Sequence, residues 1–331
     1  MRAVLVGLGV VGTRVAHGLV GAEGLASLVV VVRDPRKAAA TLNEIAGGIE
    51  IRKGGVDDLP PADVTIVAAS QGVRRVAQAA LAGGSHVVCI SDDPSDVRGL
   101  LALDRLARAQ ERTVVIGAAM APGLSCVLAA YLRRDFDTVD ELHVASAGTG
   151  GPACARRHHA ALAAIAVDWE DGEWRRRSGG SGRELVWFPG QPSADCYRAN
   201  RPDAELLLPA LPGLRRVTSR AAASRRDRTT SWLPMLRRPH PEGTVGAVRV
   251  EVRGTLHGAA RSVVLGAGGR PAVLAGAVAA VAALRAARGE LSSGAGGLAS
   301  LIGYPGEMLA ELSDRGIAVM KFEGDQPVPS W

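Results

Sequence analysis

Three glycines near the N-terminus, Gly7-x-Gly9-x-x-Gly12, follow a short apolar run and open a helical pattern. In such a unit the first glycine permits a tight turn, and the second lets the backbone approach a pyrophosphate. The third lets the helix pack closely on the strand, and the helix N-terminus adds free N–H groups. The spacing predicts a dinucleotide site that also includes Val10 and Val11. The alternative is a glycine-rich turn with no ligand.

The residues after the second apolar run bear on the choice of dinucleotide. A site for NAD usually places a carboxylate at that point, where it holds the ribose 2′-hydroxyl. Here Val32 is followed by Arg33, which can stack on adenine and pair with a 2′-phosphate, and Lys37 adds charge one turn later. Asp34 is better explained as the cap of a helix that begins at Pro35. The sequence therefore favours NADP, and NAD remains possible.

A second polar segment, 148–159, joins a glycine-rich turn to a helix with two arginines and two histidines. Arginine can bind a carboxylate through two hydrogen bonds, and histidine titrates near neutral pH. Arg156 lies three residues before His159, so the two could share a helix face. We expect Arg156 to bind a substrate carboxylate and His159 to act as a general acid, with His158 in reserve. A polar helix surface with nothing bound is the alternative.

Two further pairs of residues are candidates. Ser70 and Gln71 follow an expected strand, and ligands of open α/β sheets bind at the carboxyl ends of strands, so we expect both to contact the cofactor. Tyr197 could donate a proton while Arg198 binds a substrate carboxylate, although packing explains this pair equally well. Cys154 and His158 are spaced for one helix face, but no second pair completes a metal site. We expect no metal.

The elements that must position these residues fall into two patterns. Apolar runs at 3–6, 28–32, 64–69, 86–90 and 113–116 predict strands, and 11–20, 38–46, 73–82 and 97–110 predict helices. This alternation is typical of a Rossmann-type, doubly wound parallel α/β sheet. Later segments predict a helix at 124–132, a strand at 141–146, a hairpin turn at Asp171-Gly172, a second hairpin within 244–265, and a helix at 272–287.

We therefore expect a dinucleotide-binding domain at 1–123 and an inserted α+β substrate domain at 124–266. The C-terminal helices, 267–331, are expected to pack back on the first domain. Met120 and Ser125 flank the loop where the two domains join, so we expect them in a cleft, with Met120 against the substrate.

Composition excludes several classes of protein. The 331 residues include 39 Lys and Arg against 33 Asp and Glu, but the arginines are scattered among acids and aromatic residues make up only 3%. This distribution does not predict a nucleic-acid surface. The longest apolar stretch, 271–284, is shorter than the roughly 20 residues of a membrane span. Four isolated cysteines without a CxxC pair indicate a reducing cytoplasm.

Several segments together resemble the saccharopine dehydrogenase-like superfamily. They are the glycine fingerprint, ADVTIV at 62–67, GSHVVC at 84–89, GAAMAPGLS at 117–125, and the stretch from 272–276 to 322–324. This resemblance implies a pyridine-nucleotide enzyme that forms or oxidises a secondary amine through an imine. Many relatives carry Asp after the second strand and an acidic residue at the position of Cys89, so cofactor preference and substrate stay open. The paired histidines are also similar to those of dihydrodipicolinate reductase.

The sequence thus predicts an NAD(P)-dependent oxidoreductase that transfers hydride to or from an amino-acid-derived imine, secondary amine or carbonyl group. Its expected partners are a small-molecule substrate and a second copy of the chain, with no nucleic acid or membrane. Two alternatives remain: a non-catalytic Rossmann nucleotide-binding protein, and a Rossmann enzyme that uses bound NAD(P) without net redox change.

Overall fold

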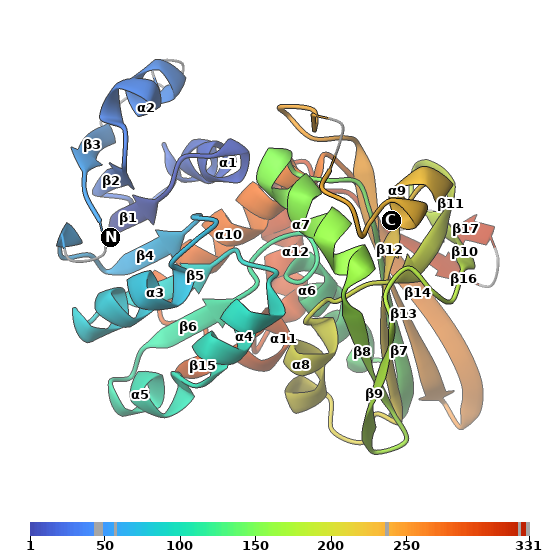
Figure 1. Cartoon of the computed structure of the whole chain (residues 1–331). Helices are drawn as coiled ribbons and strands as arrows, with labels where there is room; N and C mark the ends of the chain where they lie inside the picture. Colours follow the sequence, from blue (N-terminus) through green and yellow to red (C-terminus); the bar gives the residue numbers. More distant parts are fainter. Residues whose placement is uncertain (43–48, 56–57, 236–237, 324–325, 329–331) are drawn as a thin grey trace. The chain divides into compact units, whose positions relative to one another are not determined.

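The computed structural model describes residues 1–42, 49–55, 58–235, 238–323 and 326–328. The chain forms two compact units (Figure 1). Met1–Ala119 and Ala272–Gly303 make the first, and Met120–Pro271 and Tyr304–Trp331 make the second. All eleven aromatic residues belong to the second unit, so the first has a wholly aliphatic core. No helix in the described ranges is both long enough and apolar enough to span a membrane.

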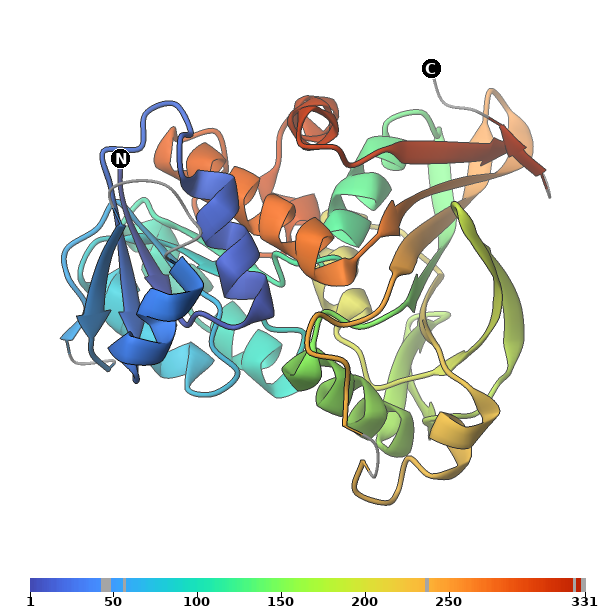
Figure 2. The ribbon, with the colours of Figure 1, turned by 90° about the horizontal axis from the view of Figure 1, so that it is seen from above.

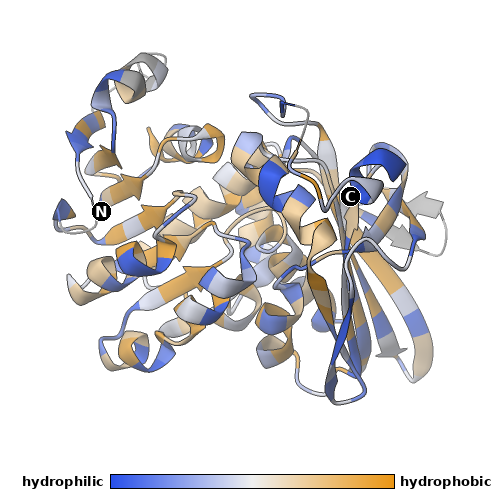
Figure 3. Ribbon diagram, viewed as in Figure 1, coloured by the Kyte–Doolittle hydropathy of each residue, from blue (hydrophilic) through white to orange (hydrophobic). Residues whose placement is uncertain are grey.

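The first unit is built on a parallel sheet of seven strands in the order β15-β6-β5-β4-β1-β2-β3. The strands are β1 (Arg2–Val6), β2 (Ser27–Val32), β3 (Ile49–Lys53), β4 (Val64–Val67), β5 (His86–Cys89), β6 (Thr113–Ile116) and β15 (Gly294–Gly296). Strand order reverses between β1 and β4, which is where ligands bind in open α/β sheets. Hydrophobic colouring follows β4 and β6 in Figure 3, as expected of strands buried on both faces.

The helices of this unit are α1 (Val10–Leu19), α2 (Pro35–Leu42), α3 (Val73–Ala82), α4 (Pro94–Leu101), α5 (Asp104–Ala109), α10 (Pro271–Ala287) and α11 (Leu298–Leu301). The single helix expected at 97–110 is wrong: it is two helices, and Asp104 at the start of α5 accepts a hydrogen bond from the Ala295 amide of β15. The alanine-rich α10 lies beside α1 (Figure 2), and a Cβ atom at Gly276 would lie 2.4 Å from that of Arg14. Small side chains therefore allow this close approach.

The second unit is a mixed sheet of ten strands with the main path β10-β11-β12-β7-β13-β14-β16-β17, and β8 pairs with β12 and β9. The strands are β7 (Thr138–Ala147), β8 (Ile165–Glu170), β9 (Glu173–Ser178), β10 (Glu184–Phe188), β11 (Gln191–Arg198), β12 (Arg216–Ala222), β13 (Gly246–Leu256), β14 (Ala259–Gly269), β16 (Val319–Glu323) and β17 (Gln326–Val328). The helices are α6 (Leu124–Arg133), α7 (Pro152–Ala163), α8 (Asp203–Leu207), α9 (Arg225–Thr229) and α12 (Pro305–Asp314), with a 3₁₀ turn at Leu208–Ala210.

Both predicted hairpins form, β8–β9 around Asp171-Gly172 and β13–β14 around His257-Gly258. All four turn residues have positive φ, as two-residue hairpin turns of this kind require. The expectation that everything after residue 266 packs on the first unit is wrong. β16 pairs with β14, so the chain from Tyr304 onward belongs to the second unit. An unpaired edge of β14 would leave backbone groups without partners, and β16 supplies them.

Alternate residues of the second sheet point to opposite faces, and the two faces differ in chemistry. On β12, Val217, Ser219 and Ala221 are buried, and α8 packs on their side because Ser219 hydrogen-bonds Asp203 of that helix. The intervening residues, Arg216 and Arg220 among them, point to the opposite face. That face is rich in arginine and acidic residues.

Candidate functional site

The turn between β1 and α1 shows why two of the three glycines are needed for folding. Gly7 has a φ of +95°, which favours glycine, and its amide donates to the Val31 carbonyl at 3.0 Å. A Cβ atom at Gly12 would lie 2.3 Å from the carbonyl oxygen of Gly7. No real Cβ tolerates that distance, so Gly12 lets α1 start directly against the turn.

Gly9 has a different environment. It is the N-cap residue of α1, its φ of −82° suits any residue, and a Cβ atom there would meet no heavy atom within 4 Å. No side chain caps the first turn of α1, which begins with the half-buried Val10 and Val11. Packing therefore does not explain Gly9. Open space beside a helix N-terminus is what a pyrophosphate needs from this position.

Ser70 and Gln71 lie at the same edge of the sheet as this turn. They follow β4, and both are exposed. The Ala68 amide donates to the Val6 carbonyl at 2.8 Å, and a Cβ atom at Gly7 would touch the Ala68 backbone at 3.0 Å. The end of β4 and the glycine turn are thus neighbours at the point where the strand order reverses.

The residues after β2 include an exposed basic side chain and an acidic side chain that caps the following helix. Arg33 is exposed, whereas Oδ1 of Asp34 accepts a hydrogen bond from the Arg36 amide at 3.1 Å, as a capping residue does. Lys53 ends β3 in register with Val32 and is also exposed, so the structure adds a cation that sequence reasoning missed. Only the pairing of β3 with β2 could reveal it. The side chain of Lys37 lies outside the described residues.

The loop from Met120 to Ser125 is fixed by a buried carboxylate of α8. Asp203 is 0% exposed and accepts hydrogen bonds from Ser125 Oγ at 3.4 Å and Ser219 Oγ at 3.0 Å. Arg201 pairs with the same carboxylate at 3.3 Å and donates to the Ala121 carbonyl. Met120 is buried, with 7% of its surface exposed. These hydrogen bonds and this ion pair fix the conformation of the loop. Met120 is packed in the interior and does not project into solvent.

The pairing expected on α7 does not form. Arg156 is exposed, whereas His159 is 8% exposed and its Nε2 lies 2.9 Å from the Leu233 carbonyl oxygen. That carbonyl can only accept, so Nε2 carries a proton that is already donated to the backbone. Residues three apart on a helix differ by about 60° in direction, which is enough to place one inside and the other outside. The second histidine, His158, is half-buried.

The Tyr197–Arg198 pair is also corrected. Adjacent residues on β11 point to opposite faces. Tyr197 is buried against Leu162 and Ala221, with the Arg228 guanidinium 5.5 Å from its ring centre. Arg198 lies on the other face and pairs with Asp168 at 3.4 Å. The two cannot act together on one substrate, because the sheet lies between them.

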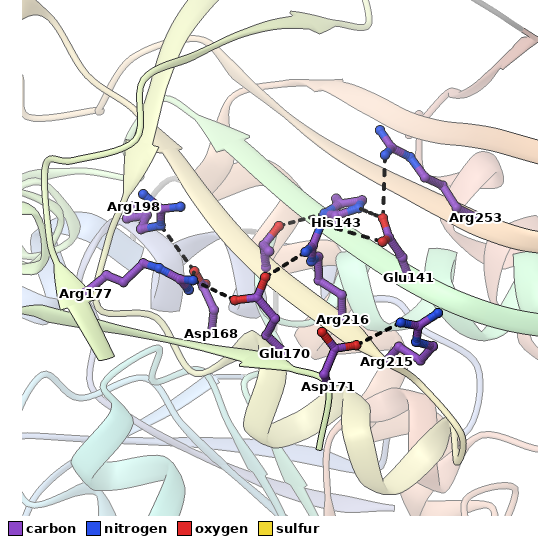
Figure 4. Close-up of polar contacts among 11 residues, drawn as sticks. Glu141, His143, Asp168, Glu170, Asp171, Arg177, Arg198, Arg215, Arg216 and Arg253 are labelled. Carbon is purple, nitrogen blue, oxygen red and sulfur yellow. Dashed lines mark hydrogen bonds and ion pairs between the residues drawn. The ribbon is translucent and has the colours of Figure 1, made fainter. Parts of the chain in front are cut away.

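A polar cluster that sequence reasoning missed surrounds His143 on β7 (Figure 4). Its Nδ1 lies 2.8 Å from Thr218 Oγ1, and its Nε2 lies 3.1 Å from Glu141 Oε2. Burial lowers the pKa of His143, and the Arg253 charge lowers it further, while Glu141 acts in the opposite direction. Alternation along 141–146 would have placed Glu141 and His143 on one face, but partners from β12 and β13 do not follow from the sequence.

No protein-family model matches the chain, and the known proteins that are similar to it include two dehydrogenases. The L-aspartate dehydrogenase of Bradyrhizobium diazoefficiens is 33% identical over 137 residues, which cover 40% of this chain and 46% of that protein. The match thus spans just under half of the relative's length. The structure of apo saccharopine dehydrogenase (L-Glu forming) from Saccharomyces cerevisiae superposes with a TM-score of 0.70 over 99% of both chains, at 15% identity.

The chain has the fold of saccharopine dehydrogenase. The fold class expected from the sequence, a doubly wound parallel sheet joined to a second α+β unit, is therefore confirmed. The resemblance read from the glycine fingerprint and the 117–125 segment is confirmed at the level of fold.

Proposed function

We propose that this protein is an NAD(P)-dependent oxidoreductase that prefers NADP. Its substrate is an amino-acid-derived imine, secondary amine or carbonyl compound. The observation that carries the proposal is the open space at Gly9. It lies beside the uncapped N-terminus of α1, in a parallel sheet whose strand order reverses at that point.

The cofactor would be held largely by backbone and by short polar side chains. The amides that begin α1 at Val10 and Val11 would face the pyrophosphate, and Ser70 and Gln71 would line the neighbouring strand end. A bound nicotinamide would supply or accept the hydride. The chain's own contribution is to bind the dinucleotide at this turn.

Preference for NADP rests on Arg33, Lys53 and the use of Asp34 as a cap. The first unit contains no aromatic residue that could stack on adenine. The guanidinium plane of Arg33 is a suitable substitute, and its charge would also pair with a 2′-phosphate. Lys53 would add to the positive potential at the same strand ends.

The substrate class is supported by the names of the two matched proteins, both dehydrogenases of amino acids. For the proton donor we propose His158 rather than His159, because Nε2 of His159 already donates to a backbone carbonyl. A general acid must deliver its proton to the substrate, and a proton bound to a carbonyl of the fold is poorly placed for that step. Arg198 is not expected to bind the same substrate, because α7 packs through Leu162 on the Tyr197 face of the sheet and Arg198 lies on the opposite face.

The test is a titration with NADPH and NADH followed by turnover assays. NADPH consumption would be measured with 2-oxo acids plus ammonia or primary amines, and NADP reduction with amino acids and secondary amines. We expect NADPH to bind more tightly than NADH and at least one 2-oxo acid to support turnover. Gly9→Val serves as the folded control that does not bind. Tight NADPH binding without consumption across both panels would refute an oxidoreductase and favour a nucleotide-binding protein. Conversion of a substrate without net NADPH consumption would refute it in favour of a non-redox enzyme.

A further inference from the structure

The polar face of the second sheet contains a cavity of about 320 Å³. Side chains from β7 to β13 line it, and Figure 4 shows most of them pointing toward one another. Five of them are arginines: Arg177, Arg198, Arg216, Arg220 and Arg253. Its volume is in the range of sites for small ligands.

The charges around this cavity do not balance. Its five guanidinium groups face three lining carboxylates, those of Asp168, Glu170 and Glu184. Beside the cavity, Glu141 pairs with Arg216 at 3.6 Å and with Arg253 at 3.5 Å. Glu251 pairs with Arg253 at 2.6 Å and with Arg249 at 2.8 Å. With these neighbours counted, six guanidinium groups meet five carboxylates, so one positive charge remains in excess. Hydrogen bonds from Arg177 and Arg216 lower the pKa of Glu170. Glu170 is therefore ionised at neutral pH and contributes one of the negative charges in this balance.

Arg220 has a buried donor without a partner. Its Nε donates to Glu184 Oε2 at 3.1 Å, and its side chain is 12% exposed. Its Nη1 is buried and has no hydrogen-bond partner among the described residues. An unsatisfied buried donor costs about 1–3 kcal/mol, and more when it is charged. Such groups are rare without a ligand, ion or water to bind them.

Two of the arginines also occupy opposed positions on neighbouring strands, each with one carboxylate partner, Asp168 for Arg198 and Glu184 for Arg220. Arg198 of β11 is directly opposite Arg220 of β12 in the register of the sheet, and both side chains line the cavity. Like charges opposite each other on one face of a sheet are destabilising. A network that served only to hold strands together would not require this pairing, whereas an anion between the two groups would stabilise it.

We propose that this cavity binds a small multivalent oxyanion, the phosphate or dicarboxylate group of a metabolite, with Arg220 Nη1 and Arg198 as its principal donors. This site is additional to the proposed dinucleotide site and does not depend on it. All of its residues belong to the second unit.

Isothermal titration calorimetry at pH 7.5 and low ionic strength tests the proposal, with inorganic phosphate and malonate as separate probes. The full chain is used with saturating NADPH, so that phosphate does not compete at the glycine turn. We expect one saturable site per chain. Tighter binding of phosphate would indicate a phosphate-bearing metabolite, and tighter binding of malonate a dicarboxylate.

Two variants localise the site. Arg220→Gln is expected to weaken binding of the better probe at least tenfold. Arg215→Gln is the matched control, since Arg215 lies immediately before β12, its side chain is 71% exposed and it pairs with Asp171 outside the cavity. It removes the same charge and should change binding less than twofold.

Arg220→Lys covers the case in which Arg220→Gln does not fold. It keeps the positive charge beside Glu184 but removes Nη1, and it should also weaken binding at least tenfold. Absence of saturable binding by both probes would overturn the proposal. Equal loss in the Arg215 and Arg220 variants would overturn it as well, since that result indicates nonspecific attraction to a basic surface.

Discussion

Gly9 and Gly12 lie three residues apart in one turn, and a single added methyl group should affect them in opposite ways. At Gly12 the new Cβ would lie 2.3 Å from the Gly7 carbonyl oxygen, so α1 must move away from the turn. Overpacking of this kind costs about 1–3 kcal/mol. At Gly9 the new Cβ would meet nothing within 4 Å, and the loss of glycine from an N-cap position costs at most about 1 kcal/mol.

Nucleotide binding should show the reverse order. Gly9→Ala places its methyl group in the space where a pyrophosphate would run, so we expect NADPH affinity to fall at least tenfold, or about 1.4 kcal/mol. Gly12→Ala should lose affinity only to the extent that the unit is destabilised, because its methyl group points at the turn and not into the open space. We therefore predict that Gly9→Ala remains stable but binds NADPH weakly, whereas Gly12→Ala is destabilised.

Separate assays can follow the two effects because every aromatic residue lies in the second unit. Far-UV circular dichroism in urea reports unfolding of both units, while tryptophan fluorescence reports only the second, so a transition seen by circular dichroism alone belongs to the first unit. NADPH affinity is measured through the fluorescence of the reduced nicotinamide. Binding by Gly9→Ala within twofold of the unmodified protein would refute the placement of the cofactor. Unchanged stability of Gly12→Ala would refute the close packing of α1.

Three further predictions concern charged residues. Arg33→Ala should weaken NADPH binding by about 1.5–3 kcal/mol, as for loss of a charged hydrogen bond, and leave NADH binding within twofold; equal loss for both in fluorescence titration would contradict its role at the 2′-phosphate. Burial lowers the pKa of His143, so the unfolded chain binds a proton first as pH falls below about 6.5 and the second unit loses stability. His143→Gln should make that loss between pH 7 and pH 5 shallower in urea titrations followed by tryptophan fluorescence, and an unchanged slope would count against it. Asp203→Ala should destabilise the same unit by about 3–5 kcal/mol in the same assay, because it leaves the nearly buried Arg201 without its carboxylate; a loss below 1 kcal/mol would show that the Ser125 loop is held by other contacts.

Much of the fold follows from local patterns in the sequence. The strand–turn–helix at the N-terminus, the alternation up to β6 and the hairpin turns at Asp171-Gly172 and His257-Gly258 were predictable. Each depends on periodicity or on backbone conformations that a few residue types favour within a short segment. Asp34 as a helix cap belongs to the same class, since its partner is two residues away.

Other features depend on pairing between distant segments. β15 consists of Gly-Ala-Gly, which carries no strand signal of its own and joins the sheet only because β6 offers an edge. β3 is short and partly charged, and Lys53 reaches the end of β2 only through parallel register. The placement of β16 on β14 likewise could not be read from 316–320.

The sequence determined which residue types were present for chemistry, and the tertiary structure decided which of them face the same space. Tyr197 and Arg198 are adjacent in the chain, but their side chains lie on opposite faces of the sheet. Arg156 and His159 were expected to act together, but Arg156 is exposed and His159 is buried. Conversely, Arg198 and Arg220 are far apart in sequence and line one cavity. Strand alternation and register fix these relations, and register depends on contacts between segments that no local pattern specifies.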